Sequence, residues 1–162
     1  MKLPKTINEK IADMIRAELK KQGHYDTGEL SSSIQLYNAS VKNENILQAF
    51  ALSYIDELEH GVPANKIRVS LEDFDNLKEW VKRKIGAFSE AEATGIASAI
   101  VSNWKKNGKP SPNSKEFSET GEVLNAIKIT FEDNEDRISE MVFDAADSDI
   151  DAEFIKTKSG TI

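Results

Sequence analysis

Hydrophobic residues in the first part of the chain recur every three or four positions, which is the spacing of a helix with one buried face. These residues are Ile7, Ile11, Met14, Ile15 and Leu19. Thr6 and Glu9 have the spacing of a capping box, and Gly23 follows two lysines as a stop signal. The pattern predicts a helix over residues 6–22, and its apolar stripe is expected to face the core rather than a partner.

After a polar link at residues 24–31, the hydrophobic period changes to two, which is typical of a strand. The apolar side of the chain changes near Leu36, so we expect a bulge there. Residues 32–41 and 46–54 predict a β-hairpin. The second strand is apolar on both faces in places, which favours a central position in a sheet, and residues 66–70 are expected to form a short third strand.

Two further stretches, residues 71–85 and 90–107, have helical spacing and predict a helical hairpin. The expected capping residues are Ser70 with Asp73 for the first helix and Ser89 with Glu92 for the second. Each helix carries one tryptophan, Trp80 or Trp104, which we interpret as a core anchor rather than a ligand-stacking residue.

The C-terminal part of the chain fits two patterns. Alternation at Ile127, Ile129 and Phe131 would suit a second β-hairpin, whereas the apolar residues of 124–145 also fit steps of three and four. No Gly or Pro occurs from residue 122 to 159, which favours a long helix over about 120–145 that could continue through Ile150 and Phe154.

These elements predict an α+β fold: a small antiparallel sheet packed with the N-terminal helix and the helical hairpin, followed by a long acidic helix. We expect one core over residues 1–108, a Pro/Ser loop over 109–119, and an acidic segment over 120–162 that packs on the core or extends from it. The loop is either a mobile arm that meets a neighbour or a connector.

Charge is distributed unevenly along the 162 residues. The net charge is −7, yet residues 1–131 are neutral, and residues 132–153 carry ten acidic side chains against Arg137 alone. This distribution argues against nucleic-acid binding through a basic patch. We expect no membrane association, because no apolar run approaches ~20 residues. There is no Cys, so a disulfide framework and a thiolate metal site are excluded.

Signatures of catalysis and of cofactor binding are missing from the sequence. Residues 147–151 imitate the start of a calcium loop, but Ala152 occupies the position of the required Gly and Lys158 that of the bidentate Glu. His60 lies near Glu57 and Glu59, which we interpret as a surface turn. No phosphate loop and no Gly-x-Ser-x-Gly elbow occur. We therefore expect no enzyme activity, no metal and no cofactor.

Two stretches that contain turn-forming residues resemble a known family. Residues 28–34 read Gly-Glu-Leu-Ser-Ser-Ser-Ile, and residues 54–63 read Tyr-Ile-Asp-Glu-Leu-Glu-His-Gly-Val-Pro. Together with the hairpin between them, they resemble the tail-completion and head–tail connector (neck) proteins of tailed bacteriophages. In that family a Gly-x-Leu-x-x-Ser-Ile stretch follows the first helix, and a strand end with Tyr runs into an apolar–Glu–x–Gly–Thr turn. Here Val62 replaces the Thr, and Glu57 stands where an aromatic residue is usual.

This resemblance covers roughly residues 7–108 and implies a structural virion protein without catalysis. It implies a homo-oligomeric ring in the neck or at the tail end, made in the bacterial cytoplasm, with portal, adaptor and tail proteins as partners. The turn and the Pro-rich loop would then be projections that meet neighbouring subunits. The candidate contact residues are Tyr54, Glu59, His60, Gly61, Pro63, Lys109, Pro110 and Pro112.

The acidic segment then gains a possible role as the lining of a DNA channel, because like charge would keep sliding DNA from sticking. The candidate channel-facing residues are Asp144, Asp147, Asp149 and Asp151. An exposed helix face that aids solubility is an equally good interpretation. Two alternatives to the virion protein remain: a non-virion module that binds a basic partner through this acidic segment, and a small hydrolase with an unrecognised site.

Overall fold

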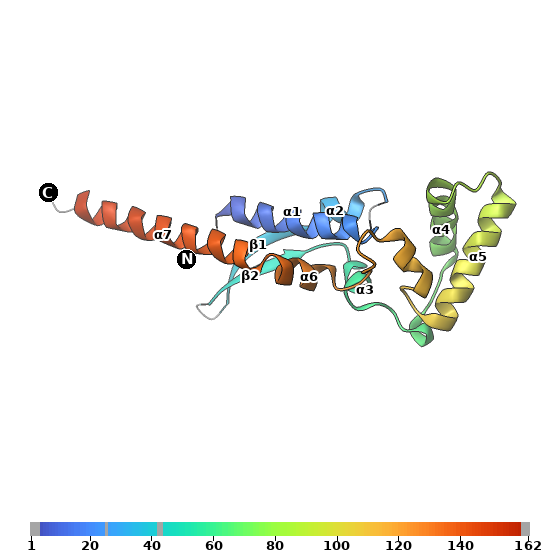
Figure 1. Ribbon diagram of the computed structural model, residues 1–162. Coiled ribbons are helices and arrows are strands. Elements are labelled where there is room, and N and C mark those ends of the chain that lie inside the picture. Colours follow the sequence, from blue (N-terminus) through green and yellow to red (C-terminus); the bar gives the residue numbers. More distant parts are fainter. Residues whose placement is uncertain (1–3, 25, 42–43, 160–162) are drawn as a thin grey trace. The chain divides into compact units, whose positions relative to one another are not determined.

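The computed structural model describes residues 4–24, 26–41 and 44–159 (Figure 1). The chain is mostly helical with one two-stranded antiparallel sheet, which confirms the predicted α+β class. It divides into two compact units that we describe separately. The ribbon unit comprises Met1–Lys21, Thr27–Leu52 and Ala126–Ile162, and the hairpin unit comprises Gln22–Asp26 and Ser53–Asn125.

The ribbon unit begins with α1 (Lys5–Lys21), whose apolar stripe is buried as predicted. The helix starts directly after Pro4, whose carbonyl accepts hydrogen bonds from the Ile7 and Asn8 N–H groups. Thr6 therefore lies inside the first turn, and the predicted capping box at Thr6 is wrong. Proline suits this boundary because its fixed φ angle favours entry into a helix.

The predicted polar link contains a short helix, α2 (Glu29–Ser33), which begins after Gly28 at φ 83°. The β-ribbon follows as β1 (Gln35–Val41) and β2 (Glu44–Phe50), so the predicted hairpin is confirmed. Both strands are shorter than predicted: β1 begins later, whereas β2 begins and ends earlier. The register from Gln35↔Phe50 to Val41↔Glu44 is continuous, so the bulge expected near Leu36 is wrong. With only two strands in this sheet, the central position expected for the second strand is wrong as well.

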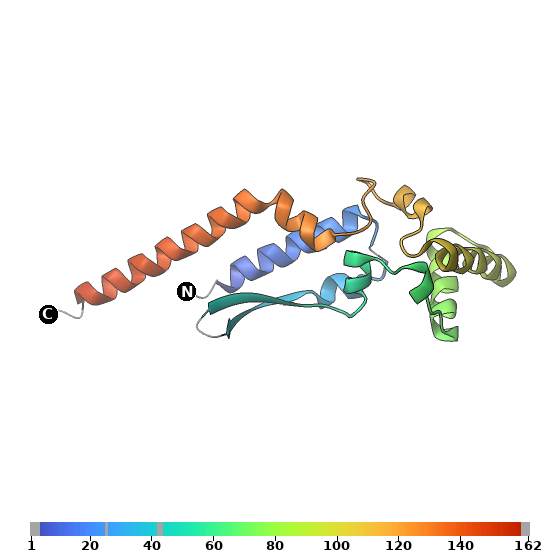
Figure 2. The same cartoon turned by 90° about the horizontal axis from the view of Figure 1, so that it is seen from below.

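The remaining helices of the ribbon unit are α6 (Ala126–Asp133) and α7 (Glu135–Ser159), which settle the C-terminal alternatives in favour of helix. The helix starts at Ala126 rather than near residue 120 because Asn125 has a left-handed φ of 58°. Asn134 separates the two helices, and its side-chain amide donates to the Thr130 carbonyl at 2.8 Å. Figure 2 shows α1 between the β-ribbon on one side and α6 with α7 on the other.

The hairpin unit is built on α4 (Leu71–Lys84) and α5 (Glu90–Asn107), which form the predicted helical hairpin. The capping box of Ser70 with Asp73 is complete, and Ser89 accepts the Glu92 N–H at 3.1 Å. Its core contains the fully buried Val81, Ala93 and Ala97, against which Trp80 packs as predicted. Small side chains at the contact let the two helices approach closely.

Three short elements complete the hairpin unit: α3 (Ile55–His60), η1 (Ala64–Lys66) and η2 (Pro112–Phe117). The third strand expected at residues 66–70 is wrong, because this stretch consists of the end of η1 and an extended link into α4. Tyr54 belongs to the start of α3 rather than to a strand end. Among the described residues, no helix combines the length and apolar character that crossing a membrane requires.

Candidate functional site

The two segments that sequence analysis singled out as projections are joined to each other in the hairpin unit. Val62, which follows the α3 turn, and Lys109, which follows α5, form an antiparallel bridge. The Val62 N–H donates to the Lys109 carbonyl and the Lys109 N–H donates to the Val62 carbonyl, both at 2.8 Å. The turn and the loop are therefore one structural feature, which we call the Val62–Lys109 joint.

Glycine is required on both sides of this joint. Gly61 has φ 72° and Gly108 has φ 86°, which are angles that L side chains rarely adopt. A Cβ atom on Gly61 would lie 2.7 Å from the Lys109 carbonyl oxygen, and one on Gly108 would lie 2.7 Å from the Val62 carbonyl oxygen. The backbones approach so closely that only glycine leaves room for the two hydrogen bonds.

Side chains around the joint hold Lys109 in place. Its ammonium lies 4.4 Å from the centroid of the Trp104 ring and 3.5 Å from a Glu57 carboxylate oxygen. Trp104 thus stacks a cation as well as belonging to the helical hairpin. The Glu59 carbonyl accepts the Asn125 N–H at 3.2 Å, which attaches a third segment to α3. The arrangement joins three backbone segments next to a half-buried cation.

The predicted contact residues differ in how accessible they are. Tyr54 is 42% exposed, and His60 and Pro63 are also exposed, whereas Gly61, Lys109 and Pro110 are half-buried. The side chain of Pro112 lies outside the part that the structure describes. His60 Nε2 lies 3.7 Å from Asp56 Oδ1 one turn earlier on α3. A partner could reach Tyr54, His60 and Pro63 without disturbing the joint.

Side chains that could ligate a metal do not gather in the described part of the chain. No group of three or more His, Asp or Glu side chains there could hold an ion. His24, the second histidine, is half-buried, and its Nε2 lies 3.0 Å from the Val123 carbonyl oxygen. Burial lowers the pKa of His24, while the hydrogen bond to Val123 opposes that shift. This contact fastens the start of the hairpin unit to its end.

The acidic residues named from the sequence all lie on α7 and are all exposed. Successive helical residues are rotated by about 100°. Asp144, Asp147 and Asp151 therefore project to one side of α7, whereas Asp149 projects to a different side. Sequence analysis grouped the four by composition, but the helix divides them between two faces.

The first stretch of the family resemblance is fastened to α1 in the ribbon unit. Arg16 donates to the Ser31 carbonyl at 2.9 Å and to the Ile34 carbonyl at 2.7 Å, and its third contact is Asp13 at 2.7 Å. Ser33 Oγ accepts the Leu52 N–H at 3.1 Å, just beyond β2. These contacts fix the entry into the β-ribbon and the exit from it.

Sequence analysis missed an apolar surface on the β-ribbon. The register places Tyr37, Ile46 and Phe50 on one face, opposite to the half-buried Leu36 and Leu47. These three side chains are 48%, 42% and 53% exposed, and the Tyr37 and Phe50 rings meet edge to face at 5.6 Å. The period-two pattern of hydrophobic residues indicated that both faces of the hairpin carry apolar side chains. We had expected a third strand in this sheet.

Comparisons of this chain with models of protein families, with curated proteins and with solved structures found no match. The residues and the geometry described above, together with the resemblance of residues 28–34 and 54–63, are the basis of the function proposed below.

Proposed function

We propose that this chain is a structural virion protein of a tailed bacteriophage, a neck (head–tail connector) or tail-completion component. It acts by contacts between protein subunits that build a ring around the DNA channel, with portal or adaptor and tail proteins as neighbours. The observation that carries the proposal is the resemblance of residues 28–34 and 54–63 to that family. The protein would be made in the host cytoplasm and incorporated at the neck or tail end.

Rigid construction of these two stretches supports the proposal. Arg16 fastens the first stretch to α1, and the reciprocal hydrogen bonds between Val62 and Lys109 fasten the end of the second. A ring component must hold its contact surfaces in a fixed geometry, because each subunit has to match the next one.

The β-ribbon offers a surface of the kind that a ring needs. Isolated two-stranded hairpins are marginally stable in water and usually require cover. Here α1 contacts the ribbon, and the Asn8 side-chain amide reaches the Leu36 carbonyl at 3.4 Å. The face of Tyr37, Ile46 and Phe50 is exposed. In a ring this face would meet a different surface of the next subunit.

Particle composition is the direct test of the proposal. Particles purified from the source are analysed by mass spectrometry, and this chain is quantified against the portal protein. We expect a fixed, low copy number comparable to that of the portal. Absence of the chain from mature particles would overturn the proposal.

The role of the β-ribbon in assembly has its own test. The double variant Tyr37→Ser, Phe50→Ser is expected to reduce incorporation into particles severely, because it removes the two largest exposed side chains of this face. Phe88→Ser is the control, since Phe88 is 98% exposed in the link between α4 and α5. Equal incorporation of both variants would exclude the ribbon face as the subunit contact.

The channel hypothesis concerns the acidic residues of α7, which lie on two faces of the helix. The variant Asp147→Asn, Asp149→Asn, Asp151→Asn removes three negative charges without changing side-chain shape. If α7 lines the channel, we expect slower or incomplete DNA ejection because the wall repels DNA less. Unchanged infectivity and ejection would count against this role while leaving the virion assignment intact.

The exposure of the α7 carboxylates also favours a second candidate, a non-virion module that binds a basic partner. Pulldown with the wild-type chain and with the three-Asn variant distinguishes this function. A basic protein that is retained only by the wild-type chain, in a cell without virion genes near this gene, would support the module.

A further inference from the structure

The second half of α7 carries an apolar stripe that nothing in the described part of the ribbon unit covers. Ala145 is the last buried residue of α7, and every residue of 147–158 is exposed. Phe143, Ile150 and Phe154 are 69%, 65% and 62% exposed. Figures 1 and 2 show this half of α7 extending past the start of α1.

Such a helix end is expected to have a partner. Isolated helices shorter than ~12–15 residues are marginal in water, and most helical stability in proteins comes from packing one face. The distal part of α7 has that length and exposes large apolar side chains. We therefore expect another surface to cover the stripe and stabilise this part of α7.

We propose that the stripe binds the same stripe of a second copy of this chain, with the two α7 helices antiparallel. Positions 143, 147, 150, 154 and 157 are separated by alternating steps of four and three, which is the spacing of a coiled-coil seam. In the antiparallel register, Ile150 lies opposite Phe154 of the other copy, and Asp147 lies opposite Thr157. The contact covers residues 147–157, or about 16 Å of helix, so Phe143 lies outside it.

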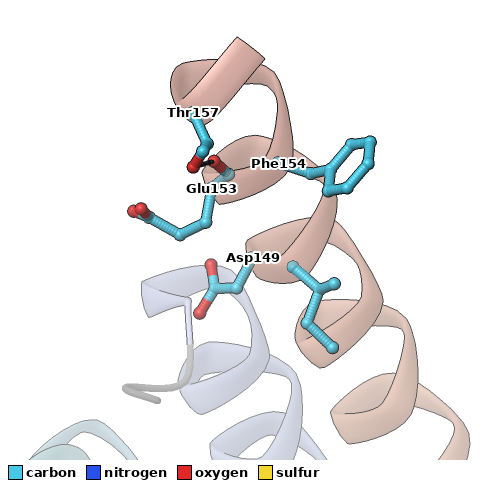
Figure 3. Close-up of a pocket in the computed structure, with 5 residues that line it drawn as sticks. Asp149, Glu153, Phe154 and Thr157 are labelled. Atoms are coloured by element: carbon cyan, nitrogen blue, oxygen red, sulfur yellow. Dashed lines mark hydrogen bonds between the residues drawn. The ribbon is translucent and has the colours of Figure 1, made fainter. Parts of the chain in front are cut away.

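A hollow on the surface of α7 has the form that such a contact requires. It is lined by Asp149 and by four residues at positions i, i+3, i+4 and i+7, namely Ile150, Glu153, Phe154 and Thr157 (Figure 3). In coiled coils, a side chain of one helix inserts into a hole formed by four residues of the facing helix. The proposed register inserts Ile150 of the second copy into this hollow.

Antiparallel helices bring two pairs of opposite charges together along one flank of the stripe. Asp144 and Asp151 lie on this flank, and Lys158 follows on the same flank one heptad after Asp151. The Lys158 ammonium already lies beside the stripe, 4.9 Å from the centroid of the Phe154 ring. Antiparallel pairing brings each Lys158 between Asp144 and Asp151 of the other copy, and it also places the two Asp151 residues near each other at the middle of the contact.

Two further charges bear on the orientation, Asp147 in its favour and Glu153 against it. A parallel, in-register pair would place Asp147 opposite its own copy inside the seam, where two like charges repel at close range. In the antiparallel pair, Glu153 comes near its own copy on the second flank. Lys156 lies 2.8 Å from Glu153 on the same helix and offsets that repulsion.

The size of the contact predicts its strength. A stable protein–protein interface buries about 800 Å² on each partner, and an overlap of three helical turns falls below that value. We expect a reversible dimer with a Kd on the order of 10–100 μM. The contact has two-fold symmetry, so it pairs two copies and does not by itself propagate a ring. It uses no part of the proposed virion function.

Sedimentation of the full chain between about 5 and 500 μM tests the pairing, a range chosen to bracket the expected Kd. We expect a monomer–dimer equilibrium in the wild-type chain and at least tenfold weaker association in Ile150→Asp. Ile155→Asp is the matched control: Ile155 is also 65% exposed, but it lies about 120° from the centre of the stripe. A wild-type monomer at all concentrations, or equal effects of the two variants, would overturn the proposal.

Orientation is tested with spin labels, since the chain has no Cys and a single introduced Cys is unique. Labels at Glu140→Cys are expected about 36 Å apart along the axis of an antiparallel dimer. A parallel pair would hold them near the helix spacing of about 10 Å, extended only by the label arms. Lys158→Glu should weaken the dimer several-fold. A short label distance, or an unchanged affinity in Lys158→Glu, would overturn the antiparallel register.

Discussion

The helical hairpin and the distal half of α7 are both amphipathic helical segments, yet they bury very different fractions of their apolar residues. Val81 in α4 and Ala97 in α5 are completely buried against each other's helix. Ile150 and Phe154 in α7 remain more than 60% exposed. Helical spacing therefore shows that a segment has an apolar face, but it does not show whether that face packs within the chain or outside it.

Ionic contacts differ between these regions in the same way. In the helical hairpin, Lys78 and Lys82 both bind the Glu90 carboxylate, at 2.8 and 2.6 Å, and connect α4 to the start of α5. In distal α7, the ion pair Lys156–Glu153 joins residues of the same helix. In the helical hairpin, ion pairs therefore connect two helices that pack together. In distal α7, the charged side chains remain accessible to solvent or to another chain.

Replacing one hydrophobic residue by Asp in each region should give the largest difference in unfolding free energy. Val81→Asp places an unpaired carboxylate in a buried site and is expected to cost about 3–5 kcal/mol of unfolding free energy. Both tryptophans of the chain lie in the hairpin unit, so tryptophan fluorescence during denaturation reports on that unit. Ile150→Asp should leave this transition unchanged. A similar loss of unfolding free energy in both variants would contradict the difference in packing between the two regions.

A substitution that disrupts the Val62–Lys109 joint should have the next largest effect on the unfolding free energy. Gly108→Ala forces a side chain into a backbone conformation that suits glycine and against the Val62 carbonyl, so we expect a loss of about 2–3 kcal/mol. Gly95→Ala is the control within α5, because a Cβ there meets nothing within 4 Å. That variant should gain about 0.5–1 kcal/mol from helix propensity. Urea denaturation followed by fluorescence measures both values.

The loss of stability at acidic pH should also differ between the two regions, although this effect is smaller. Hydrogen bonds from Lys78 and Lys82 lower the pKa of Glu90 to about 2. Since the pKa of Glu90 is lower in the folded chain, its contribution to stability is complete above about pH 4.5 and is lost as the pH falls towards 2. Glu90→Gln should flatten the loss of hairpin-unit stability over this window. An unchanged pH profile of fluorescence-detected melting would show that these contacts contribute nothing.

Charge removal from α7 should have the smallest effect on folding. The variant Asp147→Asn, Asp149→Asn, Asp151→Asn changes only exposed side chains, so we expect the unfolding free energy to shift by less than about 0.5 kcal/mol. Circular dichroism of the variant should retain the wild-type helix content. A marked loss of helix would mean that these carboxylates stabilise α7 within the chain.

Residues whose structural role depends on near neighbours were predicted well. The apolar stripe of α1, the caps at Ser70 and Ser89 and the continuation of helix through Phe154 follow from spacings of a few residues. The start of α1 was misplaced because Pro4 and Thr6 offer competing signals for its first turn. The turn at residues 59–63 and the loop at residues 109–115 were expected to be separate projections, and their pairing through Val62 and Lys109 was not foreseen.

The sequence by itself determined the long helices α1, α4 and α5 and the β-hairpin, because periodicity and capping act over one or two turns of chain. Tertiary structure decided the rest. The bridge between Val62 and Lys109 joins residues 47 positions apart, and no local pattern encodes that pairing. The exposure of Tyr37, Phe50 and Ile150 likewise depends on which elements fold back over them. Burial is a property of the whole packing arrangement, whereas hydrophobicity is a property of each residue.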